Sequence, residues 1–504
     1  MKKIIRRVFS ILPAVILQLV WLCILFTWLA PWAAAINLLL SVLSLLFVLY
    51  ITTKQDEGTY KILWLLVILT VPLPGTILYL LFGNKRTTKP LRKRLEQVSL
   101  SPAQADDTRQ IYEALETEDR RMAQTFQCVQ RTTGFPLCVN TQAVYFPLGD
   151  ELFPAMLEEM KKAERFIFAE YFIVENGLMW DSIVEIMAEK AAQGVDVRVM
   201  YDDLGSISTY SKENVKTLQK RGIQCIAFNP LTSIKGTLNY RDHRKMLVID
   251  GKAAFSGGVN LADEYINHVE KFGHWKDVGF RLTGSGVANY TRMFAEFWNA
   301  FSNNPIPDEL LAGVPKSASE TQDGYILSYY DSPLRHQPVS NELYIELLSQ
   351  AKDSAWFFTP YLMLGDALLD AFVRAARRGI DVRIIMPGVP DKKLVFRMSR
   401  SFYPVLLEAG VKIYEYTPGF VHAKGCVVDG IVGTVGTVNL DYRSLFLHFE
   451  NNSLFYRASL LEAVKSDFLD TQAQCREMKL GENVNINFWH WILDGILRIF
   501  APLC

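Results

Sequence analysis

Two histidine-centred stretches of the chain share one polar pattern. They are "HRKMLVIDGKAAFSGGVN" at 243–260 and "HAKGCVVDGIVGTVGTVN" at 422–439. In both, lysine follows the histidine by two positions, aspartate by seven, glycine by fourteen and asparagine by seventeen. Five coincident positions are a much stronger signal than a single His-x-Lys pair. The residues concerned are His243, Lys245, Asp250, Gly257 and Asn260 in the first copy, and His422, Lys424, Asp429, Gly436 and Asn439 in the second.

These residue types suit a phosphate group that is being transferred. Side chains two residues apart in a strand point to the same face, so each histidine is expected beside its lysine. One imidazole can attack phosphorus while the other protonates the leaving alcohol. The lysines can neutralise the phosphate oxygens, and the amides of Asn260 and Asn439 can donate to the same anion. We therefore expect the two sets of residues to face each other in one catalytic centre.

The two motif aspartates have a different expected position. Asp250 and Asp429 lie at an odd offset from their histidines and are followed by glycine, in "IDG" and "VDG". Asp-Gly is a strong hairpin-turn signal, so these residues are expected to point into turns. Taken alone, the pattern favours a structural role for both aspartates.

A histidine that acts as base or acid usually has a carboxylate that fixes its tautomer. Glu450 in "LDYRSLFLHFENN" and Asp277 in "FGHWKDVGF" each follow their motif at a distance that lets the chain fold back. Glu450 is the better candidate of the two. The remaining histidines have no repeated context and are expected to be structural; they are His268, His274, His336, His448 and His490.

A metal centre is a poor alternative for the repeated motif. A protonated lysine is not a metal ligand, and the motif is not accompanied by a His/Cys/carboxylate cluster at metal-binding spacing. We therefore expect no metal in this site.

The two motifs lie in two halves of the chain that repeat the same order of elements. In the first half, "ERFIFAEYFIV" predicts a strand, residues 181–194 a helix capped by Asp181 and ended by Gly194, and "VDVRVMYDD" the next strand. The second half repeats this order with "SAWFFTPYL", a helix at 366–379 and "IDVRIIMPG". This alternation predicts an α/β fold with two pseudo-symmetric lobes, in which helices flank the sheets.

Composition shifts along the chain suggest where the lobes begin and end. We expect the first lobe at 120–302 and the second at 325–480. The segment 303–324 is rich in proline, glycine and small polar residues and is predicted to be a linker, and 84–119 is predicted to be a basic linker. An apolar tail follows at 481–504. Its sequence "INFWHWILDGILRIFAPLC" is too short to span a membrane reliably, so it either lies in the membrane interface or packs against the protein body.

Residues 1–83 are predicted to form a membrane region. Two uncharged runs, 8–30 and 34–52, are long enough to cross a bilayer, but proline and glycine interrupt the third apolar segment, 61–83. Basic residues flank the region on both sides, and positive flanks prefer the cytoplasm. We therefore expect a multi-pass protein of the cell membrane, with two spanning helices, a re-entrant third segment and cytoplasmic lobes. Three full crossings remain the alternative.

The overall composition agrees with membrane attachment. Hydrophobic residues make up 50% of the 504 residues, and the formal net charge is zero. A neutral chain gives no electrostatic argument for a nucleic-acid partner.

The repeated motif resembles the HKD motif of the phospholipase D superfamily, in which HxKxxxxD occurs once in each of two lobes. The segments "NYRDHRKMLVIDGKAAFSGGVNLADEY", "FGHWKDVGFRLTG" and "GTVNLDYRSLFLHFEN", behind an N-terminal membrane region, resemble more specifically the bacterial cardiolipin synthases of this superfamily. One departure is that Gly257-Gly258 and Gly436-Thr437 stand where Gly-Ser is frequent, which puts a secondary hydroxyl contact in doubt.

The resemblance implies two phospholipase D-like lobes and a transfer between two phosphatidylglycerol molecules. The products would be cardiolipin and glycerol, formed through a phosphohistidine without a metal or organic cofactor. It implies that the first-lobe histidine is the nucleophile, although the near symmetry of the two motifs gives no independent evidence. A phospholipase D hydrolase, or a transferase with another alcohol acceptor, remains the alternative. The implied roles are catalytic for His243, Lys245, Asp250, His422, Lys424 and Asp429, and phosphate-binding for Asn260 and Asn439.

Overall fold

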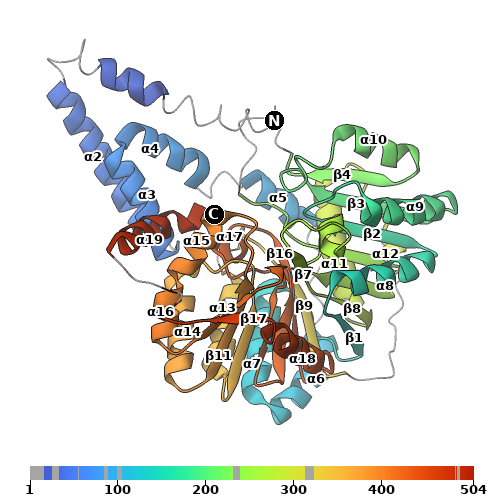
Figure 1. The fold of residues 1–504 in the computed structure, drawn as a ribbon. Coiled ribbons are helices and arrows are strands. Elements are labelled where there is room, and N and C mark those ends of the chain that lie inside the picture. The colour runs from blue at the N-terminus through green and yellow to red at the C-terminus, as the bar shows by residue number, and fades with distance from the viewer. Residues whose placement is uncertain are drawn as a thin grey trace.

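The computed structural model describes residues 16–24, 33–54, 56–83, 89–98, 105–230, 239–312, 323–335, 337–482, 484 and 488–503. Figure 1 shows two α/β lobes in contact with each other and an N-terminal helical region that projects away from them. Most of the predicted helix 8–30, the basic N-terminus and much of the predicted linker 303–324 lie outside the described residues.

The first lobe is built on a seven-stranded mixed sheet with the order β1-β8-β6-β5-β2-β3-β4. Strands β2, β3 and β4 are parallel to one another, and the other pairs are antiparallel. The strands are β1 Thr141–Phe146, β2 Phe166–Tyr171, β3 Asp196–Asp202, β4 Gln224–Phe228, β5 Met246–Ile249, β6 Ala253–Gly257 and β8 Gly279–Gly284. Its helices are α8 Gly149–Lys161, α9 Leu178–Ala192, α10 Lys212–Lys220, the 3-10 helix η3 Asp263–Ile266 and α11 Val287–Phe301.

The second lobe repeats this topology in the order β17-β12-β11-β10-β14-β15-β16-β9, with β17 added at one edge. Its strands are β9 Tyr325–Asp331, β10 Ser354–Phe358, β11 Asp381–Pro387, β12 Lys412–Tyr416, β14 Gly425–Val428, β15 Val432–Gly436, β16 Glu450–Tyr456 and β17 Cys475–Met478. Its helices are α13 Val339–Gln350, α14 Asp366–Arg377, α15 Lys393–Ser401, α16 Tyr403–Glu408, α17 Tyr442–Phe446 and α18 Leu460–Gln472. The predicted fold of two pseudo-symmetric α/β lobes is therefore confirmed.

The predicted helix start at Asp181 is wrong by three residues. Helix α9 begins at Leu178, because the carboxylate of Asp263 accepts the N–H groups of Leu178 and Met179 and so caps the helix from a distant segment. The predicted helix ends are correct, since Gly194 and Gly379 follow their helices with φ of 91° and 90°.

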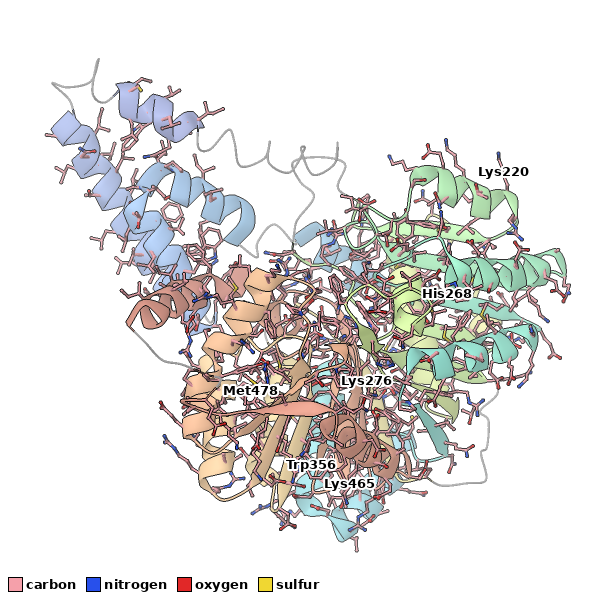
Figure 2. All side chains as sticks on the ribbon, viewed as in Figure 1. Lys220, His268, Lys276, Trp356, Lys465 and Met478 are labelled. Atoms are coloured by element: carbon pink, nitrogen blue, oxygen red, sulfur yellow. The ribbon has the colours of Figure 1, made fainter. Side chains whose placement is uncertain are left out.

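The two sheets share one hydrophobic core. Helix α11 packs on one face of the first sheet, and its buried side chains belong to the same cluster as those of β9, β14 and β16. A short parallel pair between β7 (His274–Lys276) and β13 (Gly419–Val421) also joins the lobes. The lobes are thus parts of one body, and Figure 2 shows Lys276 of β7 where they meet.

Helices lie in both predicted linkers, and one helix crosses the predicted lobe boundary. The predicted basic linker 84–119 contains the helices α5 (Lys89–Val98) and α6 (Ala105–Glu118). Helix α7 (Arg120–Thr133), assigned by sequence to the first lobe, packs on α13 and β9 of the second lobe. Buried apolar side chains on one face of α7 account for this docking. The short helix α12 (Asp308–Ala312) lies within the predicted linker 303–324.

Residues 16–24 are helical, and the helix α2 (Ala33–Thr52) follows. Among the described residues, Ala34–Thr52 is the one helix long and apolar enough to cross a membrane. Next, α3 (Gly58–Thr70) ends before Pro72, and α4 (Pro72–Leu78) with the π-helix η1 (Tyr79–Gly83) runs back along it. The hydroxyl of Tyr60 donates to the carbonyl oxygen of Gly83 (3.2 Å), so the segment ends beside the point where it began.

The C-terminal helix α19 (Phe488–Phe500) packs on α15 and α3 and leads into the 3-10 helix η4 (Ala501–Leu503). Arg498 donates to the carbonyl oxygen of Ser401. The side chains of Leu493, Ile496 and Phe500 are exposed. The helix therefore packs against the protein body, which was one of the two predicted alternatives. It also leaves three apolar side chains exposed.

Candidate active site

Each motif histidine lies just before a strand, in a segment that pairs with the opposite lobe. The backbone N–H of His243, ahead of β5, donates to the carbonyl oxygen of Phe449 (2.9 Å). The N–H of His422, ahead of β14, donates to the carbonyl oxygen of Lys276 (2.7 Å). The two motifs are thereby held at the junction of the lobes, as a shared catalytic centre requires.

The orienting carboxylates are exchanged between the lobes. Both oxygens of Glu450, at the start of β16, lie 2.9 Å from Nδ1 of His243. Oδ2 of Asp277, between β7 and β8, lies 2.6 Å from Nδ1 of His422. Sequence reasoning expected each carboxylate to fold back on its own motif, and this was wrong. Strand β8 begins just after Asp277, and β16 begins at Glu450. Both strands begin at the lobe junction, where the nearest motif histidine belongs to the other lobe.

Asp277 and Glu450 occupy equivalent positions in the repeat. Gly257 pairs with Gly279 and Gly436 pairs with Asn452, and each carboxylate lies two residues before that partner. The residue that follows the motif glycine is Gly258 in the first lobe and Thr437 in the second. This difference matches the carboxylate beside it, which is the shorter Asp277 or the longer Glu450. A Cβ on Gly258 would lie 2.0 Å from Oδ1 of Asp277, whereas Thr437 Oγ1 donates to Glu450 Oε2 (2.5 Å). The second lobe therefore keeps the hydroxyl contact that the first lobe lacks.

The motif lysines are buried and hold the histidine backbone. Nζ of Lys245 donates to the carbonyl oxygen of His243 (2.7 Å), and Nζ of Lys424 donates to that of His422. Burial lowers the pKa of Lys245 to about 8 and that of Lys424 to about 7, although Glu450 and Asp277 oppose the shift in both. Both ammonium groups therefore titrate near neutral pH.

The two imidazoles are neutral in the unliganded site. Burial, and then Lys424, lower the pKa of His422 to about 4, while Asp277 opposes the shift. Burial and Lys245 hold the pKa of His243 well below its usual value, and the charge of Lys424 adds to this effect. Charges of one lobe thus act on the histidine of the other. With Nδ1–H directed at a carboxylate, Nε2 of each ring carries a lone pair.

Glu450 is affected by the same surroundings. Burial raises the pKa of its carboxyl to about 8, although Lys245 and Thr437 oppose the shift. A proton is therefore readily held between Glu450 and His243, which lie in direct contact.

The two motif asparagines already have protein contacts. Asn260 accepts the N–H of Ile173 (3.0 Å) and donates to the Tyr265 hydroxyl (2.8 Å). Asn439 donates to Asp441 (3.0 Å). An amide NH₂ group has two hydrogens, so one on each asparagine remains for an anion. Their phosphate-binding role stays a prediction.

The motif aspartates shape turns. Asp250 and Asp429 adopt φ of 55° and 53°, and the glycine after each is also left-handed, as a type I′ turn requires. The carboxylate of Asp250 accepts three successive N–H groups at the start of β2, from Glu164, Arg165 and Phe166. Asp429 does the same ahead of β10, with Lys352, Asp353 and Ser354. These contacts place the aspartates in the scaffold, so their catalytic role, implied by the resemblance, would act through the position of the motif strands.

Sequence reasoning missed two features around His448. The structure brings His448 and Glu450 beside His243, with potential ligand atoms of all three within 4.8 Å of one another, so a cluster at metal-binding spacing does exist. The surroundings do not fit a cation, because Lys245, Lys424 and Arg443 add positive charge there. His448 was also assigned to the scaffold. The signal that would have found it is its spacing of two residues from Glu450, which places both on one side of an extended segment.

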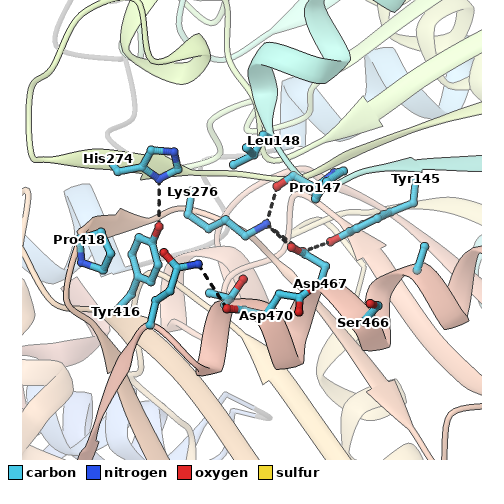
Figure 3. A pocket seen from close by; sticks show the side chains of 13 residues that line it. Tyr145, Pro147, Leu148, His274, Lys276, Tyr416, Pro418, Ser466, Asp467 and Asp470 are labelled. Atoms are coloured by element: carbon cyan, nitrogen blue, oxygen red, sulfur yellow. Dashed lines mark hydrogen bonds and ion pairs between the residues drawn. The ribbon is translucent and has the colours of Figure 1, made fainter.

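A cavity of about 710 Å³ lies on the far side of β7 (Figure 3). His274 and Lys276 line it, whereas the alternate residue Asp277 faces His422. Nζ of Lys276 lies 2.8 Å from the carboxylate of Asp467 on α18. The cavity is therefore separated from the catalytic centre by one strand, and its ion pair links the lobes.

Comparison with known proteins shows the family to which the chain belongs. Residues 156–294 and 344–471 match the family described as "Cardiolipin synthase, PLD-like domain", and residues 39–84 match "Phospholipase_D-nuclease N-terminal". A cardiolipin synthase of Alkalihalophilus pseudofirmus is 33% identical over 92% of this chain and 92% of its own length. An uncharacterized protein of Streptococcus mutans is 43% identical over 90% of this chain and 99% of its own length.

Among solved structures, a phosphatidylserine synthase of Haemophilus influenzae shares the fold with a TM-score of 0.53 at 16% identity, covering 75% of this chain and 98% of that one. Fold, paired motifs and relatives together define a membrane-associated phosphatidyltransferase of the phospholipase D type. The chain belongs to the family of bacterial PLD-like cardiolipin synthases.

Proposed function

We propose that the protein transfers a phosphatidyl group between two phosphatidylglycerol molecules and so forms cardiolipin and glycerol. The observation that carries this proposal is the pair of His–Lys sets, each completed by a carboxylate of the opposite lobe. A single such set supplies only a nucleophile or only an acid, whereas transfer needs both.

In the first step, His243 attacks phosphorus through Nε2. The N–P bond forms, the bond from phosphorus to the glycerol oxygen breaks, and His422 gives its proton to that oxygen. The anionic substrate opposes the effect of the two lysines on the imidazoles and so raises their pKa, which lets His422 carry this proton. The assignment of His243 as nucleophile follows the usual role of the first-lobe histidine in the superfamily.

In the second step, a hydroxyl of another phosphatidylglycerol replaces the glycerol. It loses its proton to His422 and attacks phosphorus, and the N–P bond breaks as cardiolipin forms. Lys245 and Lys424 offset the negative charge on the phosphate oxygens in both steps. Burial of the site at the lobe junction helps to keep water from the phosphohistidine.

The test is an assay of the purified full-length protein in phosphatidylglycerol vesicles, followed by lipid and glycerol analysis. Cardiolipin and glycerol in equal amounts are expected. Phosphatidic acid as the sole lipid product would instead identify a hydrolase.

We further propose that the membrane region crosses the bilayer at 8–30 and 34–52 and re-enters at 61–83, with the lobes in the cytoplasm. The return of Gly83 to Tyr60 supports the re-entrant path. A Lys93→Cys variant on α5, in an otherwise cysteine-free chain, is expected to react with an impermeant thiol reagent only after the cells are opened. Labelling of intact cells would contradict this topology.

A further inference from the structure

The rings that pack against the two catalytic histidines differ between the lobes. His448 lies 5.8 Å from His243, and Trp275 lies 5.6 Å from His422, measured between ring centroids. Each of these residues stands two positions before an orienting carboxylate, so the two occupy equivalent places in the repeat. One side of the catalytic centre therefore carries a polar ring where the other carries an indole.

The side of the centre around His422 is aromatic and buried. Tyr265 and Phe420 join Trp275 there, with ring centroids 5.3 Å and 5.9 Å from that of His422. All three side chains are buried. These three rings pack around the imidazole and carry no positive charge themselves.

Phe172 packs on the His243 ring with centroids 4.8 Å apart, but the side of His243 that His448 covers is polar and partly open. Nε of Arg443 donates to Nε2 of His448 (3.2 Å), and both side chains are half-buried. Burial, followed by Arg443 and Arg241, holds the pKa of His448 well below its usual value, so the ring is neutral. Because Nε2 accepts from Arg443, the proton of the neutral ring lies on Nδ1. An N–H donor thus stands next to His243, and the guanidinium of Arg443 stands on the other side of the His448 ring.

The same short helix that carries Arg443 also contacts the membrane region. Tyr442 of α17 stacks on Tyr60 of α3, with ring centroids 5.6 Å apart and an interplanar angle of 11°. Leu447, just after α17, belongs to the same cluster as Ile51 and Trp64. The polar side of the catalytic centre is therefore the side that adjoins the N-terminal membrane region.

We infer that Arg443 and His448 form a subsite for the second lipid and bind its non-reacting phosphodiester. This inference rests on the proposed function, in which the acceptor is itself an anionic phospholipid. The reacting phosphate occupies the two His–Lys sets, so the acceptor's own phosphate, one glycerol unit away from the attacking hydroxyl, needs a further cation. A guanidinium is well suited to a phosphate because its N–H groups match two of the oxygens.

The test compares two acceptors with the same full-length protein in phosphatidylglycerol vesicles. Cardiolipin formation uses the anionic lipid as acceptor, whereas incorporation of labelled glycerol into phosphatidylglycerol uses a neutral alcohol at the same phosphoenzyme. In Arg443→Gln, the ratio of cardiolipin formation to glycerol exchange is expected to fall about tenfold to hundredfold, the loss typical of one charge-assisted hydrogen bond.

Three further variants make the result specific. Arg443→Lys keeps the positive charge and is expected to restore most of the ratio. His448→Phe, which places an apolar ring there as in the first lobe, is expected to lower the ratio. Arg374→Gln removes an exposed arginine of α14 that pairs with Asp370 on its own helix, and it is expected to leave the ratio at the wild-type value.

An unchanged ratio in both Arg443→Gln and His448→Phe would overturn the subsite. If Arg443→Gln does not fold, glycerol exchange is lost as well, and His448→Phe alone then decides. A wild-type protein that exchanges glycerol but forms no cardiolipin would refute the proposed function itself, a result that differs from an unchanged ratio.

Discussion

The two lobes hold the same His–Lys pair in very different surroundings. Around the first motif, Arg241 pairs with Asp202 (2.8 Å), and Arg244 pairs with Asp242 (2.9 Å) and with Glu170. All of these side chains are buried. The equivalent positions in the second lobe carry apolar or small residues: Phe358, Pro387, Phe420, Val421 and Ala423.

The residues that are the same in both lobes are those that the reaction requires. The residues that differ hold the motif strands in position. The histidines, the lysines and the Asp-Gly turns are the same in both lobes, because both halves of the reaction need them. Their supports are either ion pairs or apolar packing, since either can fix a strand. We therefore expect substitutions of the shared residues to lower the transfer rate to a similar extent in both lobes. Substitutions of the residues that support the motif strands should have different effects on stability in the two lobes.

The largest effect is expected from the histidines. His243→Ala and His422→Ala should each lower the transfer rate by several orders of magnitude, because each removes the nucleophile or the acid and base. His268→Ala, on the exposed surface of the first lobe, serves as the control (Figure 2). Wild-type activity in either catalytic variant would break the functional equivalence of the lobes.

The exchanged carboxylates should give the next largest effect. Glu450→Gln and Asp277→Asn keep the side-chain shape but replace the proton-accepting carboxyl group that fixes the tautomer with an amide, so each should lower the transfer rate by about 10² to 10⁴. Vesicle assays of both variants measure this. A loss in only one of them would show that one histidine works without an orienting partner.

Stability should distinguish the lobes most clearly at Arg244. Arg244→Met leaves Glu170 and Asp242 buried without their cation and should cost about 3–5 kcal/mol of unfolding free energy. Phe358→Leu, at the position equivalent to Glu170, should cost about 1 kcal/mol. Thermal unfolding in detergent compares them, and equal losses would contradict the assignment of an ionic support to the first lobe only.

Two substitutions in the first lobe, Gly258→Thr and Asp277→Glu, would reproduce the residues found at the equivalent positions of the second lobe. Gly258→Thr should displace the Asp277 carboxylate and lower the transfer rate by about a hundredfold, since a loss of about 2–3 kcal/mol is typical of a broken charged hydrogen bond. Adding Asp277→Glu supplies the longer side chain found in the second lobe and should restore part of the activity. A double variant as slow as Gly258→Thr would show that the lobes are not interchangeable here.

The smallest effect concerns pH. Lys424 and Lys245 are charged below their pKa values of about 7 and about 8, so phosphate binding weakens as pH rises through this range. The value of kcat/KM should fall by about tenfold per pH unit between the two pKa values and by about a hundredfold per pH unit above both, where two required protons are lost. Lys424→Arg, whose guanidinium stays charged, should move the start of this decline toward the pKa of Lys245. A profile that rises between pH 7 and 9 would contradict a role for charged lysines.

Much of this architecture follows from local sequence. The Asp-Gly turns, the helix ends at Gly194 and Gly379 and the repeat of the two lobes depend on neighbouring residues and were predicted correctly. The exchange of Glu450 and Asp277 was not predicted, because it depends on how the two sheets pack against each other. The docking of α7 on the second lobe and the contact of His448 with His243 are non-local for the same reason.

We propose that one histidine of the pair carries the phosphatidyl group between the two lipids as a phosphohistidine. The most direct measurement is rapid acid-free quenching of the wild-type protein with phosphorus-labelled phosphatidylglycerol, followed by identification of the labelled peptide. Label is expected on His243, and it should pass into cardiolipin when unlabelled phosphatidylglycerol is added, as a phosphohistidine intermediate requires. Label that is absent from both motif histidines during steady cardiolipin formation, or that unlabelled lipid does not discharge, would contradict it.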